Sequence, residues 1–356
     1  MVISHIHFRS QRSSTDSILM LTTKSMTPVT FQNRLKSISN RVKHDVYNHC
    51  KSFSQKSNLL EPFQPNNQFS LNRTTTLENV YLLLHYSPRR DDEHGLYLQI
   101  ATSYLLSKNL QQLSIQQQIR TRVAIFLSEN YTNVTYTRLE QWFKSIYEPY
   151  TNVTHIFRTK DDKQASREFM MNYTKYDEEV QLDTILFLLE DDYIFEVDML
   201  SDTIEFFSSH NPCFIQQTDN SDRCRLDINE NDGFITIVNG RTRLWRSIST
   251  TTVTYACRLK TFLAFEDIMM HYDNDFESRR KIRERVGNVA IFCAVPSYGI
   301  RLEALLLPNE INSTVDIDNA AYYKDWWSFA RHAVSEAQKQ DTFPAPKVNE
   351  QNLFTK

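Results

Sequence analysis

Three acidic residues, Glu190, Asp191 and Asp192, come directly after the apolar run Ile185–Leu189. A run of this kind predicts a buried strand, which would deliver three carboxylates to one point. Adjacent carboxylates repel each other unless a cation neutralises them. Oxygen ligands suit Mg²⁺ or Mn²⁺, and such ions usually share phosphate oxygens of a substrate. The pattern therefore favours a reaction in which a diphosphate leaves and the metal ion acts as a Lewis acid.

The same acids also allow an interpretation without a metal. One of them is able to cap the next helix, and the others to pair with arginines. Their position after a buried strand favours the metal site, because ligands of open parallel sheets bind outside the carboxyl ends of the strands.

The elements that must position these acids are strands alternating with helices. This order implies β-α-β units, a parallel sheet and helices on both of its faces. No Gly-rich turn follows the first strand, so the usual dinucleotide-binding fingerprint is absent. After Leu200 we expect a mixed α+β half built onto the sheet. The expected strands are Glu78–Ser87, Thr121–Asn130, Asn152–Phe157 and Asp183–Leu189, and the expected helices are Gly95–Leu110, Thr137–Tyr150 and Lys163–Tyr176.

The chain divides by composition into three parts. Residues 1–75 are polar and predict a flexible N-terminal extension, with one helix around Phe31–Ser54. Residues 76–335 hold the alternating elements and predict the functional domain, and residues 336–356 predict a polar tail. The net charge of −3 gives no overall attraction to nucleic acid.

The number of cysteines and the length of the apolar runs indicate which cellular compartment to expect and whether the chain spans a membrane. No run long enough to span a membrane occurs, and the N-terminus lacks the apolar stretch of a secretory signal. Five cysteines predict free thiols in a reducing compartment, with a Cys213–Cys224 bridge as the alternative. We therefore expect a cytoplasmic protein. Six Asn-x-Ser/Thr sites leave a secretory route or an organelle open: Asn72, Asn130, Asn133, Asn152, Asn172 and Asn312.

Two stretches resemble a known family. "LFLLEDDYIF" (Leu186–Phe195) and "LWRSISTTTVTYACRLKTFLAFED" (Leu244–Asp267) are similar to motifs of GT-A-fold glycosyltransferases of the family-2-like, surface-glycan type. The resemblance covers about residues 78–328. It implies a GT-A fold, a Rossmann-like parallel or mixed sheet flanked by helices. It also implies inverting transfer of a sugar from a nucleoside-diphosphate-sugar donor to a hydroxyl of a glycan or another acceptor, with Mn²⁺ or Mg²⁺.

The resemblance also implies roles for the acidic residues. Asp192 and Glu190 would hold the metal ion, and Asp191 would support the nucleotide-sugar diphosphate. Asp267 matches the catalytic base, which takes the acceptor proton as the new bond forms. Glu266 is the competing base. The structural alternative for Asp267 is an acid favoured at a helix start.

Donor contacts are implied by the ends of the other predicted strands. Tyr86 and Ser87, after the first strand, would face the base and ribose. Glu129, after the second strand, lies where the family places an acid on the base. Arg167, opening the third predicted helix, would approach the ribose or the diphosphate.

Aromatic residues supply the acceptor candidates. Trp245 is able to stack on a sugar face and Arg246 to anchor a phosphate, with a core position as the alternative for Trp245. For Trp326 and Trp327 we favour the core over an acceptor platform.

One departure from the family pattern bears on activity. Related sequences carry a histidine after the last sheet element, and residues 295–308 here contain none. His271 is a weak substitute. This departure motivates an alternative function, a catalytically weak or inactive glycan- or nucleotide-binding protein. A nucleotidyltransferase is a further alternative, which the absence of a Gly-rich phosphate loop disfavours.

Overall fold

A computed structural model describes twelve segments of the chain. All of them belong to one compact unit, Ser39–Lys356. The described residues are 42–52, 77–87, 93–151, 153–159, 173–174, 180–191, 193–218, 237–248, 254–269, 275–287, 291–301 and 317–340.

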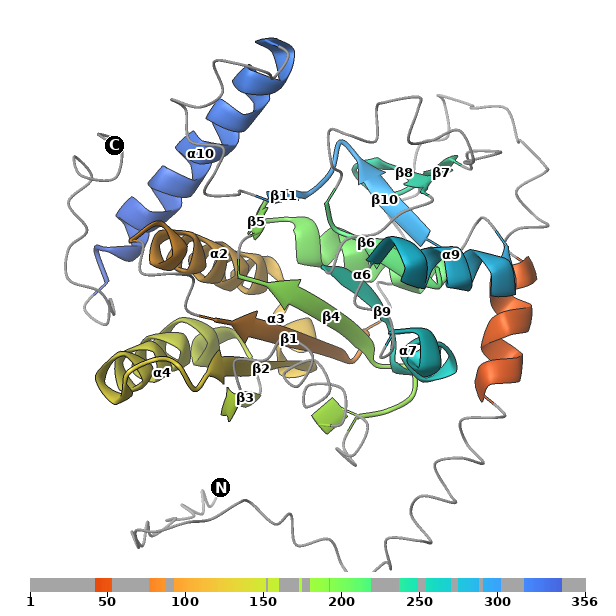
Figure 1. Ribbon diagram of the computed structural model, residues 1–356, viewed down its shortest axis with the longest axis horizontal. Coiled ribbons are helices and arrows are strands. Elements are labelled where there is room, and N and C mark those ends of the chain that lie inside the picture. Colours follow the sequence, from red (N-terminus) through yellow and green to blue (C-terminus); the bar gives the residue numbers. More distant parts are fainter. Residues whose placement is uncertain are drawn as a thin grey trace, which may run out of the picture. The chain divides into compact units, whose positions relative to one another are not determined.

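A nine-stranded mixed sheet forms the centre of this unit, in the order β3-β2-β1-β4-β9-β6-β10-β8-β7 (Figure 1). The first four strands in this order are parallel, and β9 runs antiparallel to both β4 and β6. A second sheet pairs β5 with β11. The strands are β1 (Val80–Tyr86), β2 (Thr121–Ser128), β3 (Val153–Thr159), β4 (Ile185–Glu190), β5 (Tyr193–Phe195), β6 (Phe214–Gln216), β7 (Ile237–Asn239), β8 (Leu244–Ser247), β9 (Tyr255–Arg258), β10 (Ile291–Val295) and β11 (Gly299–Arg301).

The helices connect these strands as the alternating pattern predicts. A helix at residues 42–52, within the range Phe31–Ser54 in which one was expected, precedes β1. Of the third predicted helix, Lys163–Tyr176, only residues 173–174 are described. The named helices are α2 (Glu93–Gln112), α3 (Ile115–Ile119), α4 (Asn133–Tyr147), α6 (Met199–His210), α7 (Leu259–Ala264), α8 (Glu266–Met269), α9 (Asp275–Val286) and α10 (Ile317–Ala337), with a 3₁₀ turn η1 (Glu148–Tyr150).

The central strands are buried on both faces. Val80, Leu82 and Leu84 of β1 join a core cluster with apolar residues of α2, α4, α6 and α10, while Tyr81 and Leu83, on the other face, are also buried. Burial on both faces explains why the strands read as nearly continuous apolar runs. The expected α/β class with a mixed second half is confirmed.

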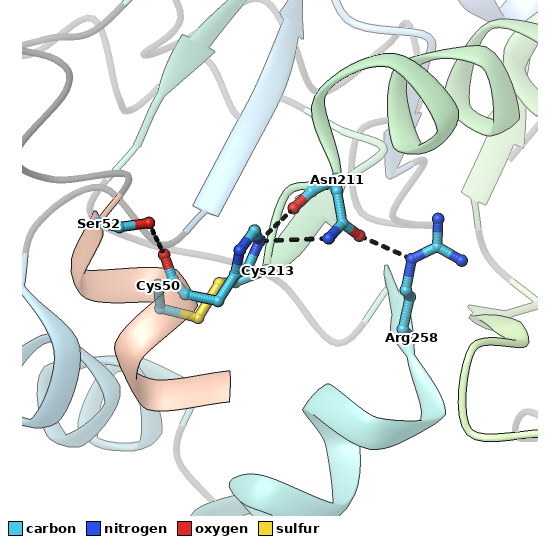
Figure 2. The surroundings of a disulfide bond; sticks show 6 residues. Cys50, Ser52, Asn211, Cys213 and Arg258 are labelled. Carbon is cyan, nitrogen blue, oxygen red and sulfur yellow. Dashed lines mark hydrogen bonds between the residues drawn. A yellow bond between two sulfur atoms is a disulfide. The ribbon is translucent and has the colours of Figure 1, made fainter. Parts of the chain in front are cut away.

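The expectation of free thiols is wrong for two of the five cysteines. Cys50 of helix 42–52 forms a disulfide with Cys213, which directly precedes β6 (Figure 2). Their Cα atoms are 6.1 Å apart. Cys224, the alternative partner for Cys213, lies outside the described residues, whereas Cys257 and Cys293 are buried thiols outside this disulfide. The disulfide thus joins helix 42–52, which lies in the predicted N-terminal extension, to the residue before β6.

A buried ion pair lies at the amino ends of β4 and β6. Arg258 donates to both carboxylate oxygens of Glu78, each at 3.0 Å, and its Nε donates to Oδ1 of Asn211 at 2.7 Å (Figure 2). It also donates to the backbone oxygen of Asp183. The Arg258 and Glu78 side chains are only 8% and 13% exposed, so this pair holds the residues just before β1 to the end of β9.

Candidate functional site

The strand order places a topological switch point between β1 and β4. The chain moves from β1 to β2 and β3 on one side, and returns to β4 on the other side of β1. In open sheets of this kind, ligands bind outside the carboxyl ends of the strands where the order reverses. Ser87 follows β1, and Glu190 and Asp191 end or follow β4, so three predicted residues lie at this point.

Asp191 holds the two strand ends together. Its side chain is 5% exposed. Its Oδ2 accepts from the backbone N–H of Ser87 at 3.1 Å and from Nε2 of Gln99, on α2, at 2.7 Å. The Gln99 amide also donates to the backbone oxygen of Ser87 at 2.7 Å, and its own oxygen accepts from the hydroxyl of Tyr131 at 2.9 Å. This bonding fixes the loop after β1 against the loop after β4.

Gln99, Tyr131 and Thr102 are site residues that the sequence did not indicate. Thr102 of α2 donates from its hydroxyl to the backbone oxygen of Tyr193 at 2.7 Å, which fixes the chain beyond Asp191. These polar residues are 3%, 8% and 1% exposed, respectively. For Gln99 and Thr102 the one available signal is a polar residue at a buried position of a helix, and using it requires knowing which face of α2 is buried.

Tyr86 supports the site from within the core. It is 1% exposed, and its hydroxyl lies 2.7 Å from that of Ser103. Burial raises the pKa of the Tyr86 phenol well above its ordinary value, so the group stays neutral. The predicted contact of Tyr86 with a nucleotide base has no support from this position. Ser87, half-buried at the strand end, is the better-placed residue of the two.

Glu190 and Asp191 have different surroundings because successive strand residues face opposite sides of a sheet. Asp191 is turned toward α2, whereas Glu190 is half-buried and lies in register with His85 of β1. The backbone N–H of Glu190 is 3.4 Å from the hydroxyl oxygen of Thr254. Asp191 is thus engaged in holding the loops, and Glu190 is the half-buried carboxylate at the strand end.

The predicted metal site is only partly inside the described residues. Asp192 and Arg167 lie outside them, as does His271. Within the described segments, no group of three His, Cys, Asp or Glu residues could hold a metal ion. Asp191 is a poor ligand, because two N–H donors already contact its Oδ2. The described residues therefore do not by themselves fit the ion, and its assignment to Asp192 and Glu190 stays a prediction.

Glu129 lies exposed after β2, one strand away from the switch point. Its backbone N–H donates to the backbone oxygen of Thr159, the last residue of β3, at 2.7 Å. It is at the same edge of the sheet as Ser87 and Glu190, as the sequence predicted.

Asp267 and Glu266 lie near the other end of β4. Because β9 runs antiparallel to β4, the chain leaves β9 beside the amino end of β4, where the N–H of Leu259 donates to the backbone oxygen of Thr184. Figure 1 draws α7 beside the tail of the β4 arrow. Phe265, just before α8, packs on Phe214 at the amino end of β6, with ring centroids 5.5 Å apart. The fold does not bring Asp267 together with Asp191.

Asp267 has a structural partner at this end. Arg285 of α9 donates to both of its carboxylate oxygens, at 2.9 and 2.8 Å, and also to the hydroxyl of Tyr47 at 2.8 Å. The hydrogen bonds from Arg285 hold the pKa of the Asp267 carboxyl below its ordinary value, which favours an ion-paired carboxylate over a proton acceptor. The role of base stays a prediction that this geometry disfavours.

The acceptor candidates differ in their positions. Trp245 is 1% exposed and stacks on Phe206 with centroids 4.3 Å apart. A Cβ atom added to Gly240 would lie 2.2 Å from Nε1 of Trp245, so the packing of this tryptophan requires glycine at position 240. Trp245 is therefore a core residue, as the alternative interpretation held.

Arg246, the next residue, is half-buried. Trp326 of α10 is 8% exposed within the core cluster, as favoured, and the side chain of Trp327 lies outside the description.

Comparisons with known proteins give weak likenesses. No family model and no curated protein matches the chain. A structure of S. aureus TarS 1-349 is 13% identical with a TM-score of 0.39, over 74% of this chain and 66% of that one. The structure of S. aureus TarS 1-349 in complex with UDP-GlcNAc has 12% sequence identity and a TM-score of 0.39, over 74% of this chain and 67% of that one. The structure of mouse xyloside xylosyltransferase 1 has 9% sequence identity and a TM-score of 0.31, over 59% of this chain and 78% of that one. Likeness at this level establishes neither fold nor function for this chain.

None of the described helices combines the length and the apolar character that a membrane span requires.

Proposed function

We propose that the chain is a glycosyltransferase that binds a nucleoside-diphosphate-sugar outside the carboxyl ends of β1 and β4. The observation that carries this proposal is the position of Glu190 and Asp191 at the switch point, beside Ser87. The resemblance of the motif containing these acids to that of GT-A-fold transferases supports it. Metal dependence and inversion of the anomeric carbon belong to this proposal through the resemblance alone.

In the proposed reaction, the acceptor hydroxyl oxygen forms a bond to the anomeric carbon while the bond from that carbon to the diphosphate oxygen breaks. The diphosphate leaves with the electron pair, and a divalent cation, when bound, would stabilise its charge. The hydroxyl proton passes to a general base. Asp191 and Gln99 contribute by holding the two loops in one arrangement before the donor binds, which reduces the cost of ordering them.

Glu190→Gln is expected to weaken donor binding at least tenfold, because it removes the charge of the half-buried carboxylate at the strand end and keeps its size. The measurement is a calorimetric titration with a panel of nucleoside-diphosphate-sugars in the presence of Mn²⁺. Glu148→Gln, an exposed acid on η1, is the matched control and should bind like the wild type. Equal affinity of the Glu190 variant and the wild type would remove Glu190 from the proposal.

A binding protein without turnover is the second candidate. The location of Asp267 near the amino end of β4 favours it, because the described residues at the switch point then lack the predicted base. Release of sugar or transfer product by the wild-type chain would decide for the enzyme, and tight binding without any product would decide for the binding protein.

A further inference from the structure

Two independent features bear on the compartment in which this chain matures and on a modification site. The first is the Cys50–Cys213 disulfide, which joins residues 163 positions apart in the sequence. Structural disulfides persist in oxidising environments such as the lumen of the secretory pathway, and are rare where thiols are kept reduced. The second is a pair of adjacent glycosylation acceptors, Asn130-Tyr131-Thr132 and Asn133-Val134-Thr135.

The first acceptor sequence lies in the turn between β2 and α4, and the second forms the first three residues of α4. Asn130, Thr132 and Asn133 are all exposed. Thr132 caps α4, since its hydroxyl oxygen accepts from the backbone N–H of Thr135 at 3.2 Å. The four other acceptor sequences of the chain, at Asn72, Asn152, Asn172 and Asn312, begin outside the described residues.

Asn133 is the better acceptor of the two by its own hydrogen bonding. Its Oδ1 accepts from the Arg158 guanidinium at 2.9 Å, which fixes the orientation of the amide. A glycan is attached through Nδ2, so this bond is retained after modification. The next residue, Val134, is 62% exposed, and a glycan beside it would cover this apolar surface.

We propose that the chain matures in an oxidising, glycosylating compartment and carries an N-linked glycan on Nδ2 of Asn133. In this step the anomeric carbon of the sugar forms an N-glycosidic bond to Nδ2, and the bond from that carbon to the diphosphate of a lipid-linked oligosaccharide donor breaks. The lipid diphosphate leaves with the electron pair, and Nδ2 loses one proton to the transferring enzyme. This proposal favours the secretory route that the sequence left open over the expected cytoplasmic location, and it does not depend on the function proposed above.

The test maps glycosylation on the full chain directed into the secretory pathway of a eukaryotic cell. Peptide N-glycosidase converts an occupied asparagine to aspartate, which peptide mass spectrometry detects. We expect conversion at Asn133 in the wild type and in Thr135→Ser, which keeps the acceptor sequence. Thr135→Val, which removes the sequence and leaves Asn133 and Arg158 in place, should show no conversion at Asn133. Recovery of the Cys50–Cys213 peptide checks that each variant is folded.

An unmodified Asn133 in the wild type, or conversion confined to other asparagines, would overturn the assignment. The same mapping on the chain isolated from its own cells tests the compartment. A modified Asn133 with a bonded Cys50 supports the proposal, and an unmodified Asn133 with a reduced Cys50 overturns it.

Discussion

Arg258→Met is expected to lower the free energy of unfolding by about 3–5 kcal/mol, the largest stability effect that the described contacts predict. The substitution keeps most of the side-chain volume but leaves the Glu78 carboxylate, 13% exposed, without its bidentate partner. It also removes the donors to Asn211 and to the Asp183 backbone. Urea unfolding followed by circular dichroism measures the change.

Lys260→Met is the matched control for Arg258→Met. Lys260 lies at the same end of β4 and pairs with Asp183, whose side chain is 70% exposed. An exposed pair contributes about 0–1 kcal/mol, so this variant should stay close to the wild type. Replacing Glu78 by Gln in the Arg258→Met background should recover part of the loss, because no buried charge then remains. Equal stability of the two methionine variants would show that the Glu78–Arg258 pair does not hold the strand ends.

Asp191→Ala is expected to abolish detectable donor binding and to destabilise the fold by about 2–4 kcal/mol. Two buried donors, the N–H of Ser87 and the amide of Gln99, lose their acceptor, and hydrogen bonds to a charged group contribute about 1.5–3 kcal/mol each. The loop after β1 is then no longer held against the loop after β4. Titration calorimetry and urea unfolding measure the two effects.

Asp191→Asn separates the two roles of this residue. The asparagine keeps an acceptor oxygen for Ser87 and Gln99, so the stability loss should be clearly smaller than that of Asp191→Ala. Donor affinity that follows stability through both variants indicates that Asp191 acts by positioning the loops. An Asp191→Ala variant that is as stable as the wild type would contradict the hydrogen bonding described for this site.

The sequence predicted the edge of the sheet at which the candidate site lies. The apolar runs gave β1, β2 and β4, and alternation with helices made those strands parallel, which puts Ser87, Glu129 and Glu190 at one edge. These strands could be found in the sequence because they are buried on both faces of the sheet, and a strand buried in this way forms a nearly unbroken apolar run.

The partners of these residues could not be predicted in the same way. Gln99 is 92 residues from Asp191 and Cys50 is 163 from Cys213, so both contacts depend on tertiary packing. The position of Asp267 relative to β4 could not be predicted for a different reason. Local pattern indicates that Tyr255–Arg258 is a strand but not its direction, and the antiparallel direction of β9 carries Asp267 toward the amino end of β4.

Hydrogen exchange of the full chain, measured by mass spectrometry with and without a bound nucleoside-diphosphate-sugar, tests the central claim most directly. Binding outside the carboxyl ends of β1 and β4 should slow exchange in peptides containing Ser87 and Glu190, and leave peptides from α7 and α8 unchanged. Slowed exchange confined to α7, α8 and α9, or no change anywhere at saturating donor, would contradict the account.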